Sequence, residues 1–281
     1  MGGAGWTLNR RILQCRMMTP NPAPTQGGAD ATRAALSWAH TARFLTTASR
    51  LDQLPAHDLP EIAFVGRSNA GKSTAINTLA QQRQLAFASK KPGRTQHINL
   101  FELGPKDAPS ALWADLPGYG YAAVERAAKL RWQAVMADYL KMRRNLAGVV
   151  QMIDSRHGFT ALDRQLLEFV GPRVVTGEVK LLVLLTKADK LNRKEASAAL
   201  RSAQDFLADL STDQSDLSVT LFSALKRQGV EDVAQTLHDW RDASAAPIEG
   251  GLLAASAALR AERFETPDDV VIPADPAEPA A

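Results

Sequence analysis

The sequence is poor in cysteine and contains no long apolar run. Its 281 residues include one cysteine, Cys15, so the chain cannot form an internal disulfide or a cysteine-based zinc site. No apolar run reaches the roughly 18–20 residues that a membrane span requires. These absences predict a soluble protein of a reducing compartment, which we expect to be the cytoplasm, without a membrane partner.

Net charge is small, but it is unevenly distributed. The formal charge of +3 combines +3 in residues 1–60, +5 in residues 61–243 and −5 in residues 244–281. Hydrophobic residues make up 45% of the chain, enough to bury the core of a domain of about 180 residues. We therefore expect a globular domain at 31–243, a disordered extension at 1–30 and a disordered, acidic, Ala/Pro-rich tail at 244–281.

Short apolar runs alternate with amphipathic helical patterns in the central domain. The expected strands are 62–65, 111–114, 147–153, 179–185 and 217–222, and the expected helices are 72–82, 124–142, 160–170, 192–210 and 230–240. A further short helix is expected within 31–49. Apolar strands separated by helices predict an α/β fold, a mostly parallel sheet with helices on both faces. Ligands then bind beyond the carboxyl ends of the strands.

The first strand leads into a match to GxxxxGK[ST], the phosphate-loop pattern. The matching residues are Gly66, Arg67, Ser68, Asn69, Ala70, Gly71, Lys72 and Ser73. Such a loop wraps its backbone N–H groups around phosphate oxygens, and the N-terminus of the following helix adds its dipole. We expect Lys72 to reach the β- and γ-phosphates and the Ser73 hydroxyl to bind Mg²⁺.

The base is predicted by two later loops. The strand at 179–185 ends in an [NT]KxD pattern, made by Thr186, Lys187, Ala188 and Asp189. A carboxylate accepts both N1–H and N2–H₂ of guanine, a donor pair that adenine lacks, so Asp189 predicts guanine. The stem of Lys187 can lie across the base, and the loop Ser223–Leu225 fits a backbone contact to guanine O6.

Two segments between these motifs predict a nucleotide switch. A DxxG pattern is made by Asp115, Leu116, Pro117 and Gly118; Asp115 is expected to hold Mg²⁺ through a water, and the Gly118 N–H to contact the γ-phosphate. Asp154 is a rival for the Mg²⁺ role, its alternative being a hydrogen-bonding role in the next loop. Thr95, in a basic Gly/Pro loop, predicts a residue that binds Mg²⁺ and senses the γ-phosphate. Lys72, Thr95 and Gly118 are the expected catalytic residues.

Six motifs in this order resemble the EngB (YihA/YsxC) GTPases of the TrmE-Era-EngA-EngB-septin-like superfamily. They are GRSNAGKST, KPGRTQ, DLPGYGYA, DSRHG, TKADK and SALK, and the resemblance covers about residues 40–243. It implies a P-loop GTPase with a mixed, mostly parallel, six-stranded sheet. It also implies a switch in the assembly of the large ribosomal subunit, needed for normal cell division and septation. The acidic tail departs from the family pattern.

The resemblance further implies particular ligands and contacts. Mg²⁺ would be held by Ser73 and Thr95, and Asn69 matches an asparagine that can help to bind K⁺ in related GTPases. GTP or GDP would be contacted by Gly66–Ser73, by Gly93, Arg94 and Thr95, by Asp115–Gly118, by Thr186–Asp189, and by Phe222, Ser223 and Ala224.

A residue that helps Ras-like enzymes to hydrolyse GTP is missing. These enzymes orient the attacking water with a glutamine directly after DxxG, and this chain has Tyr119 there. A phenol orients water poorly, so we expect slow intrinsic turnover, completed by a partner or a cation. Arg94 is a candidate arginine finger, with phosphate or rRNA contact as the alternative.

Basic clusters suggest an RNA partner. They are Lys90, Lys91 and Arg94; Lys141, Arg143 and Arg144; and Lys226 and Arg227. Such clusters either bind RNA phosphates or are solvated surface. With the resemblance, they favour the large ribosomal subunit or its rRNA precursor as partner of a monomeric protein. The alternative function is a GTP-dependent binding module that recruits cell-division proteins, with hydrolysis incidental.

Overall fold

The computed structural model describes the backbone of residues 26–86, 97–120 and 126–241. The expectations for the first 25 residues and for the acidic tail from residue 242 onward lie outside these ranges. So do those for Lys90 and Lys91 and for the switch residues Gly93, Arg94 and Thr95.

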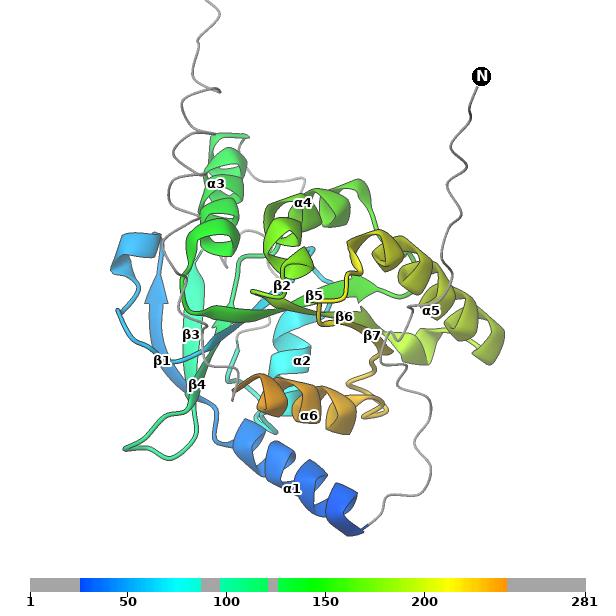
Figure 1. The fold of residues 1–281 in the computed structure, drawn as a ribbon, viewed down its shortest axis with the longest axis horizontal. Helices are drawn as coiled ribbons and strands as arrows, with labels where there is room; N and C mark the ends of the chain where they lie inside the picture. Colours follow the sequence, from blue (N-terminus) through cyan, green and yellow to red (C-terminus); the bar gives the residue numbers. More distant parts are fainter. Residues whose placement is uncertain (1–25, 87–96, 121–125, 242–281) are drawn as a thin grey trace, which may run out of the picture. The chain divides into compact units, whose positions relative to one another are not determined.

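The described chain is organised around a mixed seven-stranded sheet (Figure 1). Its strands are β1 (Arg43–Ala48), β2 (Glu61–Gly66), β3 (Ile98–Leu103), β4 (Ala111–Asp115), β5 (Leu146–Asp154), β6 (Lys180–Thr186) and β7 (Leu217–Leu221). They lie in the order β1-β3-β4-β2-β5-β6-β7. Neighbours from β4 to β7 are parallel, whereas β3 is antiparallel to both β4 and β1. The prediction of a mixed, mostly parallel sheet is confirmed.

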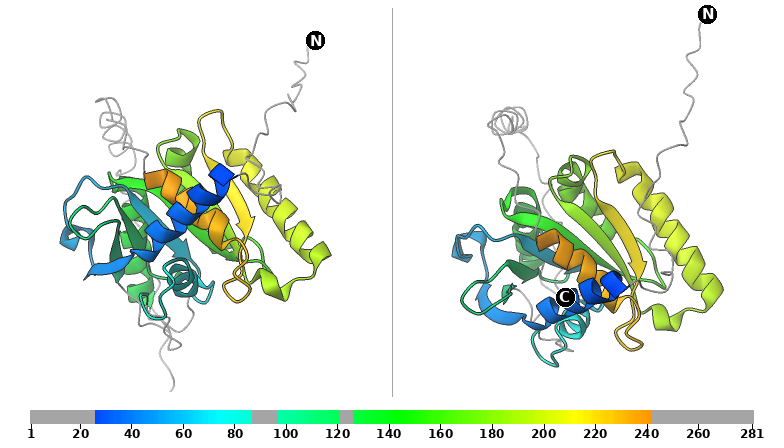
Figure 2. Two further views of the ribbon diagram at one scale, coloured as in Figure 1. Left: turned by 90° about the horizontal axis from the view of Figure 1, so that it is seen from below. Right: turned by 60° about the horizontal axis from the view of Figure 1, so that its bottom comes forward.

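Helices cover both faces of this sheet. They are α1 (Gln26–His40), α2 (Lys72–Leu79), α3 (Arg126–Met142), α4 (Ala161–Val175), α5 (Arg193–Leu207) and α6 (Val230–Arg241), with 3₁₀ turns η1 (Leu51–Gln53), η2 (Ala188–Lys190) and η3 (Ala208–Leu210). Figure 2 shows α1 beside α6 on one face, where α2 also lies; α3, α4 and α5 cover the other. None of the described helices combines the length and apolar character needed to cross a membrane.

The two faces have separate apolar cores because side chains alternate along each strand. On β2, Ile62 and Phe64 pack toward the side of α1, α2 and α6, whereas Ala63 and Val65 pack toward α3, α4 and α5. All four side chains are fully buried. A strand that is apolar on both sides is what a sheet covered on both faces requires.

The expected number of six strands is wrong by one, and the helix expected within 31–49 occupies only the first part of that range. Helix α1 ends at His40, and Arg43–Ala48 forms the edge strand β1. Two β-branched residues, Thr46 and Thr47, favour this extended conformation. Phe44 and Leu45 fit a helical spacing, yet they remain 56% and 39% exposed on the edge strand. The helix also begins earlier than expected, at Gln26.

A buried ionic network fixes the start of β2, the strand that leads into the phosphate loop. Glu61 is completely buried and accepts hydrogen bonds from Arg143 (2.6 Å) and from the Tyr139 hydroxyl (2.6 Å), and it lies 2.7 Å from His57 Nε2. Burial alone would raise the pKa of Glu61, but hydrogen bonds with His57, Arg143 and Tyr139 lower it to about 2. The Arg143 side chain therefore pairs with a buried carboxylate and is not part of the basic surface cluster expected for it.

Candidate nucleotide-binding site

The phosphate loop joins β2 to α2 at the carboxyl edge of the parallel strands. Asn69 and Gly71 have positive φ angles of 65° and 99°, which turn the loop back toward the helix. Gly66 has no room for a side chain, because a Cβ there would lie 2.9 Å from the Met152 carbonyl oxygen. The strand–loop–helix arrangement that the motif predicts is thus present.

The DxxG segment lies directly against this loop. The Ser68 N–H donates to the Tyr119 carbonyl (2.8 Å), and the Tyr119 N–H donates to the Gly66 carbonyl (3.3 Å). A Cβ on Gly118 would lie 3.2 Å from the Ser68 N and Cα atoms, so glycine permits this close approach of two backbones. The two segments expected to meet the γ-phosphate are therefore linked by backbone hydrogen bonds.

Lys72 and Asp115 form a buried ion pair beneath the loop. Their Nζ and Oδ1 atoms are 2.6 Å apart, and the side chains are only 8% and 1% exposed. The other carboxylate oxygen, Oδ2 of Asp115, is buried and has no hydrogen-bond partner among the described residues. An unpaired buried acceptor is costly, and Mg²⁺ with its bound water would supply the missing partner.

The donor set also fits a metal held together with a nucleotide. Within the described ranges, no group of three or more His, Cys, Asp or Glu residues could hold a metal by itself. Magnesium in nucleotide sites is commonly bound by one or two protein groups plus phosphate oxygens and water. Asp115 and the Ser73 hydroxyl match that requirement.

The two loops expected to recognise the base are joined by hydrogen bonds. The Ser223 hydroxyl donates to Asp189 Oδ1 (2.7 Å), and the Ala188 N–H donates to the Phe222 carbonyl (3.1 Å). The Ser223 hydrogen bond lowers the pKa of Asp189, which favours the ionised carboxylate that guanine requires. Ala224, the next residue of the same loop, packs against the core.

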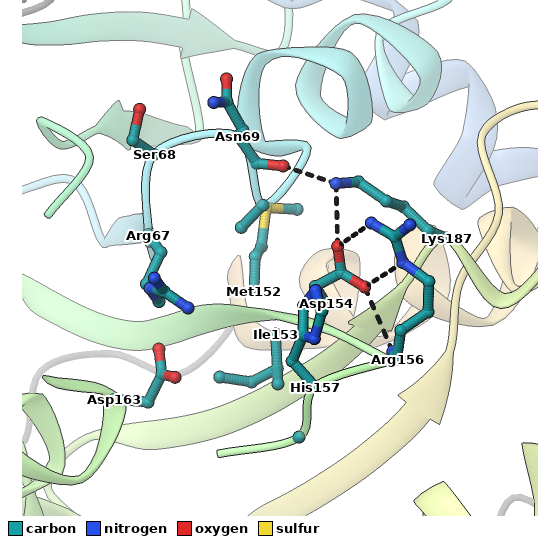
Figure 3. Close-up of a pocket in the computed structure, with 12 residues that line it drawn as sticks. Arg67, Ser68, Asn69, Met152, Ile153, Asp154, Arg156, His157, Asp163 and Lys187 are labelled. Carbon is teal, nitrogen blue, oxygen red and sulfur yellow. Dashed lines mark hydrogen bonds and ion pairs between the residues drawn. The ribbon is translucent and has the colours of Figure 1, made fainter. Parts of the chain in front are cut away.

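The base loop is also tied to the phosphate loop (Figure 3). The Lys187 ammonium donates to the Asn69 carbonyl (2.7 Å), and the Thr186 hydroxyl donates to the Ala70 carbonyl (2.6 Å). Lys187 adopts a positive φ of 58°, an uncommon conformation for a residue with a side chain. Two carbonyls of the phosphate loop are therefore held by side chains at the end of β6 and directly after it.

Asp154, the rival of Asp115 for the Mg²⁺ role, forms hydrogen bonds with side chains of the neighbouring loops, which was the alternative role expected for it. It pairs with Lys187 (2.9 Å) and with Arg156 (2.7 Å). Burial by itself would raise the pKa of Asp154, but the hydrogen bonds from Arg156 and Lys187 hold that pKa far below its usual range. The acid beside Lys72 is Asp115, whereas the predicted Mg²⁺ role of Asp115 stays a prediction.

Tyr119 points into the protein. It is 7% exposed, and its hydroxyl donates to Asp163 Oδ1 (2.7 Å). Burial and the charge of Asp163 raise the pKa of Tyr119 well above 10, so the phenol stays neutral. Asp163 also accepts from the Thr160 N–H (2.8 Å) at the start of α4. The Thr160-x-x-Asp163 spacing of a capping box is a sequence signal that could have drawn attention to this acid.

A phosphate loop between strand and helix, a DxxG segment bonded to it, and an [NT]KxD loop joined to the Ser223 loop define a P-loop GTPase. A family profile described as "50S ribosome-binding GTPase" matches residues 61–187. The chain is 61% identical over 206 residues to the probable GTP-binding protein EngB of Albidiferax ferrireducens, covering 73% of this chain and 96% of that relative. The corresponding protein of Acidovorax ebreus is 61% identical over 205 residues, covering 73% and 90%.

The chain therefore belongs to the EngB family of GTP-binding proteins, and it is a GTPase that binds GTP and GDP. A solved structure of Era, in complex with MgGDPNP and nucleotides 1506–1542 of 16S ribosomal RNA, has 20% identity and a TM-score of 0.52. The alignment covers 66% of this chain and 57% of the Era chain, and this similarity supports the fold alone. The predicted family, fold class and enzyme class are confirmed.

The described nucleotide-binding segments lie near one another as predicted. They are Gly66–Ser73, Asp115–Gly118, Thr186–Asp189 and Phe222–Ala224, and hydrogen bonds or ion pairs connect them. The individual roles of their residues remain predictions. Sequence reasoning missed the buried partner of Tyr119 and the contacts of Lys187 with Asn69 and Asp154.

Proposed function

We propose that this GTPase is a molecular switch in the assembly of the large ribosomal subunit, and that normal cell division and septation depend on it. The observation that carries the proposal is the match of residues 61–187 to a family described as ribosome-binding. A sequence pI near 9.1 is compatible with an RNA-rich partner, because cations on the protein release counterions from RNA phosphates. We place this switch in the cytoplasm, as a monomer.

The Lys72–Asp115 ion pair supports a switch mechanism in which Lys72 exchanges one anionic partner for another. When GTP binds, its β- and γ-phosphates replace Asp115 as the partners of the Lys72 ammonium. Bound Mg²⁺ would neutralise phosphate charge, held by Ser73, by Thr95 and, through a water, by Asp115. The Gly118 N–H reports the γ-phosphate to a segment already hydrogen-bonded to the phosphate loop.

Hydrolysis by the isolated protein should be slow. The Tyr119 hydroxyl is occupied by Asp163 and lies in the protein interior, so it cannot orient a water at the γ-phosphate. A partner, or K⁺ bound with the help of Asn69, would complete the site. A purified protein that hydrolyses GTP at several per second without either would contradict this part of the proposal.

The test is co-sedimentation of the full chain with purified large ribosomal subunits. The expected result is binding in the presence of a non-hydrolysable GTP analogue, weaker binding with GDP, and release at high salt. Binding that ignores the nucleotide, or no binding at all, would overturn the proposal. The module that recruits division proteins would then be the better explanation.

A further inference from the structure

A pocket of about 230 Å³ is lined by the phosphate loop, by the end of β5 with the residues that follow it, by the start of α4 and by Lys187. Figure 3 shows Arg67 and Asp163 on one side and Asp154, Arg156 and Lys187 on the other. Nucleotide phosphates are expected to meet the backbone N–H groups of the loop. Apart from Lys187, the charged side chains that line the pocket, Arg67, Asp154, Arg156 and Asp163, have no part in this expected role.

Arg67 is the unexplained group in this pocket. Its guanidinium makes no hydrogen bond or ion pair with any residue that the structure describes, and its Nε atom is buried without a partner. Leaving the buried Nε–H without an acceptor is costly. The backbone of Arg67 bridges to that of Tyr119, and its side chain packs close to Gly120, where a Cβ would lie 3.3 Å from Nε.

The acids of the pocket are already engaged by other groups. Both oxygens of Asp163 accept hydrogen bonds, one from Tyr119 and the other from Thr160. Asp154 is shared between Arg156 and Lys187. The pocket thus offers the unpaired guanidinium of Arg67 and, across the pocket, Arg156, which is paired with Asp154 and whose side chain is 44% exposed. A small anion with several acceptor oxygens fits this arrangement.

We propose that this pocket binds a backbone phosphate of RNA, with Arg67 as its main ligand and Arg156 as the second. The planar guanidinium can donate two parallel hydrogen bonds to a phosphate. Lys187 cannot do so, because its ammonium is a point charge that is already paired with Asp154. The proposal rests on the proposed ribosomal function and names the contact that couples the RNA to the phosphate loop. Arg67 belongs to the phosphate loop, and its backbone bridges to Tyr119, the residue after the DxxG segment. An RNA phosphate bound to Arg67 would therefore contact both segments that are expected to meet the nucleotide.

Binding of RNA and of nucleotide should therefore influence each other. Arg67–Ala70 line the pocket, and the backbone N–H groups of the same residues are expected to wrap the nucleotide phosphates. If RNA binds the GTP state more tightly, then GTP must bind the RNA-bound protein more tightly by the same factor.

The test compares Arg67→Gln and Arg156→Gln with a matched control, Arg201→Gln, which removes one charge from an exposed position on α5. Binding of the full chain is measured to large ribosomal subunits and to RNA extracted from them, at saturating GTP analogue and over a series of salt concentrations. Melting temperatures show that each variant is folded. Arg156→Gln keeps the test valid if Arg67→Gln does not fold.

Each pocket variant should weaken binding to both probes about three- to tenfold and reduce the slope of log affinity against log salt by about 1. Arg201→Gln should behave as wild type. Pocket variants that match the control would overturn the pocket proposal while leaving the proposed function intact. Loss of binding to intact subunits but not to their extracted RNA would also overturn it, in favour of a protein carboxylate. A wild-type chain that binds neither probe would refute the proposed function itself.

Discussion

Asp189 offers the sharpest test of how this site selects its nucleotide. The substitution Asp189→Asn replaces one carboxylate oxygen by an NH₂ group, which donates instead of accepting. The Ser223 hydroxyl can still donate to the remaining oxygen, as it does to Asp189 Oδ1 at 2.7 Å in the structure. The new NH₂ group then faces the base, where it meets the N–H donors of guanine.

The size of the effect follows from the two hydrogen bonds that are lost. Hydrogen bonds to a charged group contribute about 1.5–3 kcal/mol each, so the pair contributes about 3–6 kcal/mol. At about 1.4 kcal/mol for each factor of ten, GDP affinity should fall by about 10²–10⁴-fold. Xanthine carries a carbonyl in place of the guanine N2–H₂ group, so it can accept from the new NH₂ group and should regain affinity.

The assay is a competition titration with fluorescent GDP and with xanthosine diphosphate. Asp205→Asn, an exposed change of the same type on α5, is the control and should leave GDP affinity unaltered. Ser223→Ala should weaken GDP binding about three- to tenfold, because Asp189 loses the hydrogen bond that orients it. It should keep the preference for guanine. If Asp189→Asn binds GDP within threefold of wild type, then Asp189 does not read the base.

Four other substitutions test separate parts of the structure. Glu61→Gln should lower the free energy of unfolding near pH 7 by about 3 kcal/mol, since the pKa of Glu61 is about 2 in the folded chain against a usual 4.5. In denaturant titrations, wild type should keep this stabilisation above pH 4.5 and lose it as the pH falls toward 2. The free energy of unfolding of the variant should not show this fall between pH 4.5 and 2. Lys72→Met should abolish nucleotide binding in titrations and lower the melting temperature, because it leaves Asp115 buried without its cation. Asp154→Asn should weaken GDP affinity about tenfold, measured by competition, without changing base preference. Tyr119→Gln should leave single-turnover GTP hydrolysis within about twofold of wild type, and a rise of a hundredfold would contradict the assignment of this side chain to the interior.

The parts of the fold that sequence predicts well are those whose signal is local. Strands β2, β5 and β6 are runs of apolar residues because helices cover both of their faces, so a window of six or seven residues suffices. The antiparallel strands β1 and β3 carry polar residues among apolar ones, and β1 lies at the sheet edge with one side exposed. β3 pairs with the next strand, β4, but the pairing of β1 with β3 joins residues such as Arg43 and Glu102, and no local window contains that information.

The same distinction applies within the site. The phosphate loop, the DxxG segment and the Asp189 loop are contiguous motifs whose spacing carries their chemistry. The buried role of Glu61 depends on Arg143, which lies 82 residues away, and Lys187 contacts Asn69 across 118 residues. Charge alone made Arg143 look like part of a surface cluster. Only the fold shows that its partner is buried in the core.

Position 119 shows what can and cannot be concluded from the absence of a glutamine after DxxG. The sequence establishes that a glutamine is absent after DxxG, which predicts slow hydrolysis. The structure shows that the backbone of Tyr119 is fixed by hydrogen bonds to Ser68 and Gly66, and that its side chain runs inward to Asp163. A glutamine on the same backbone would follow the same direction and meet Asp163, not the γ-phosphate. The slow turnover that we propose would then follow from how this segment is anchored to the phosphate loop and α4, and a group from elsewhere would have to orient the water.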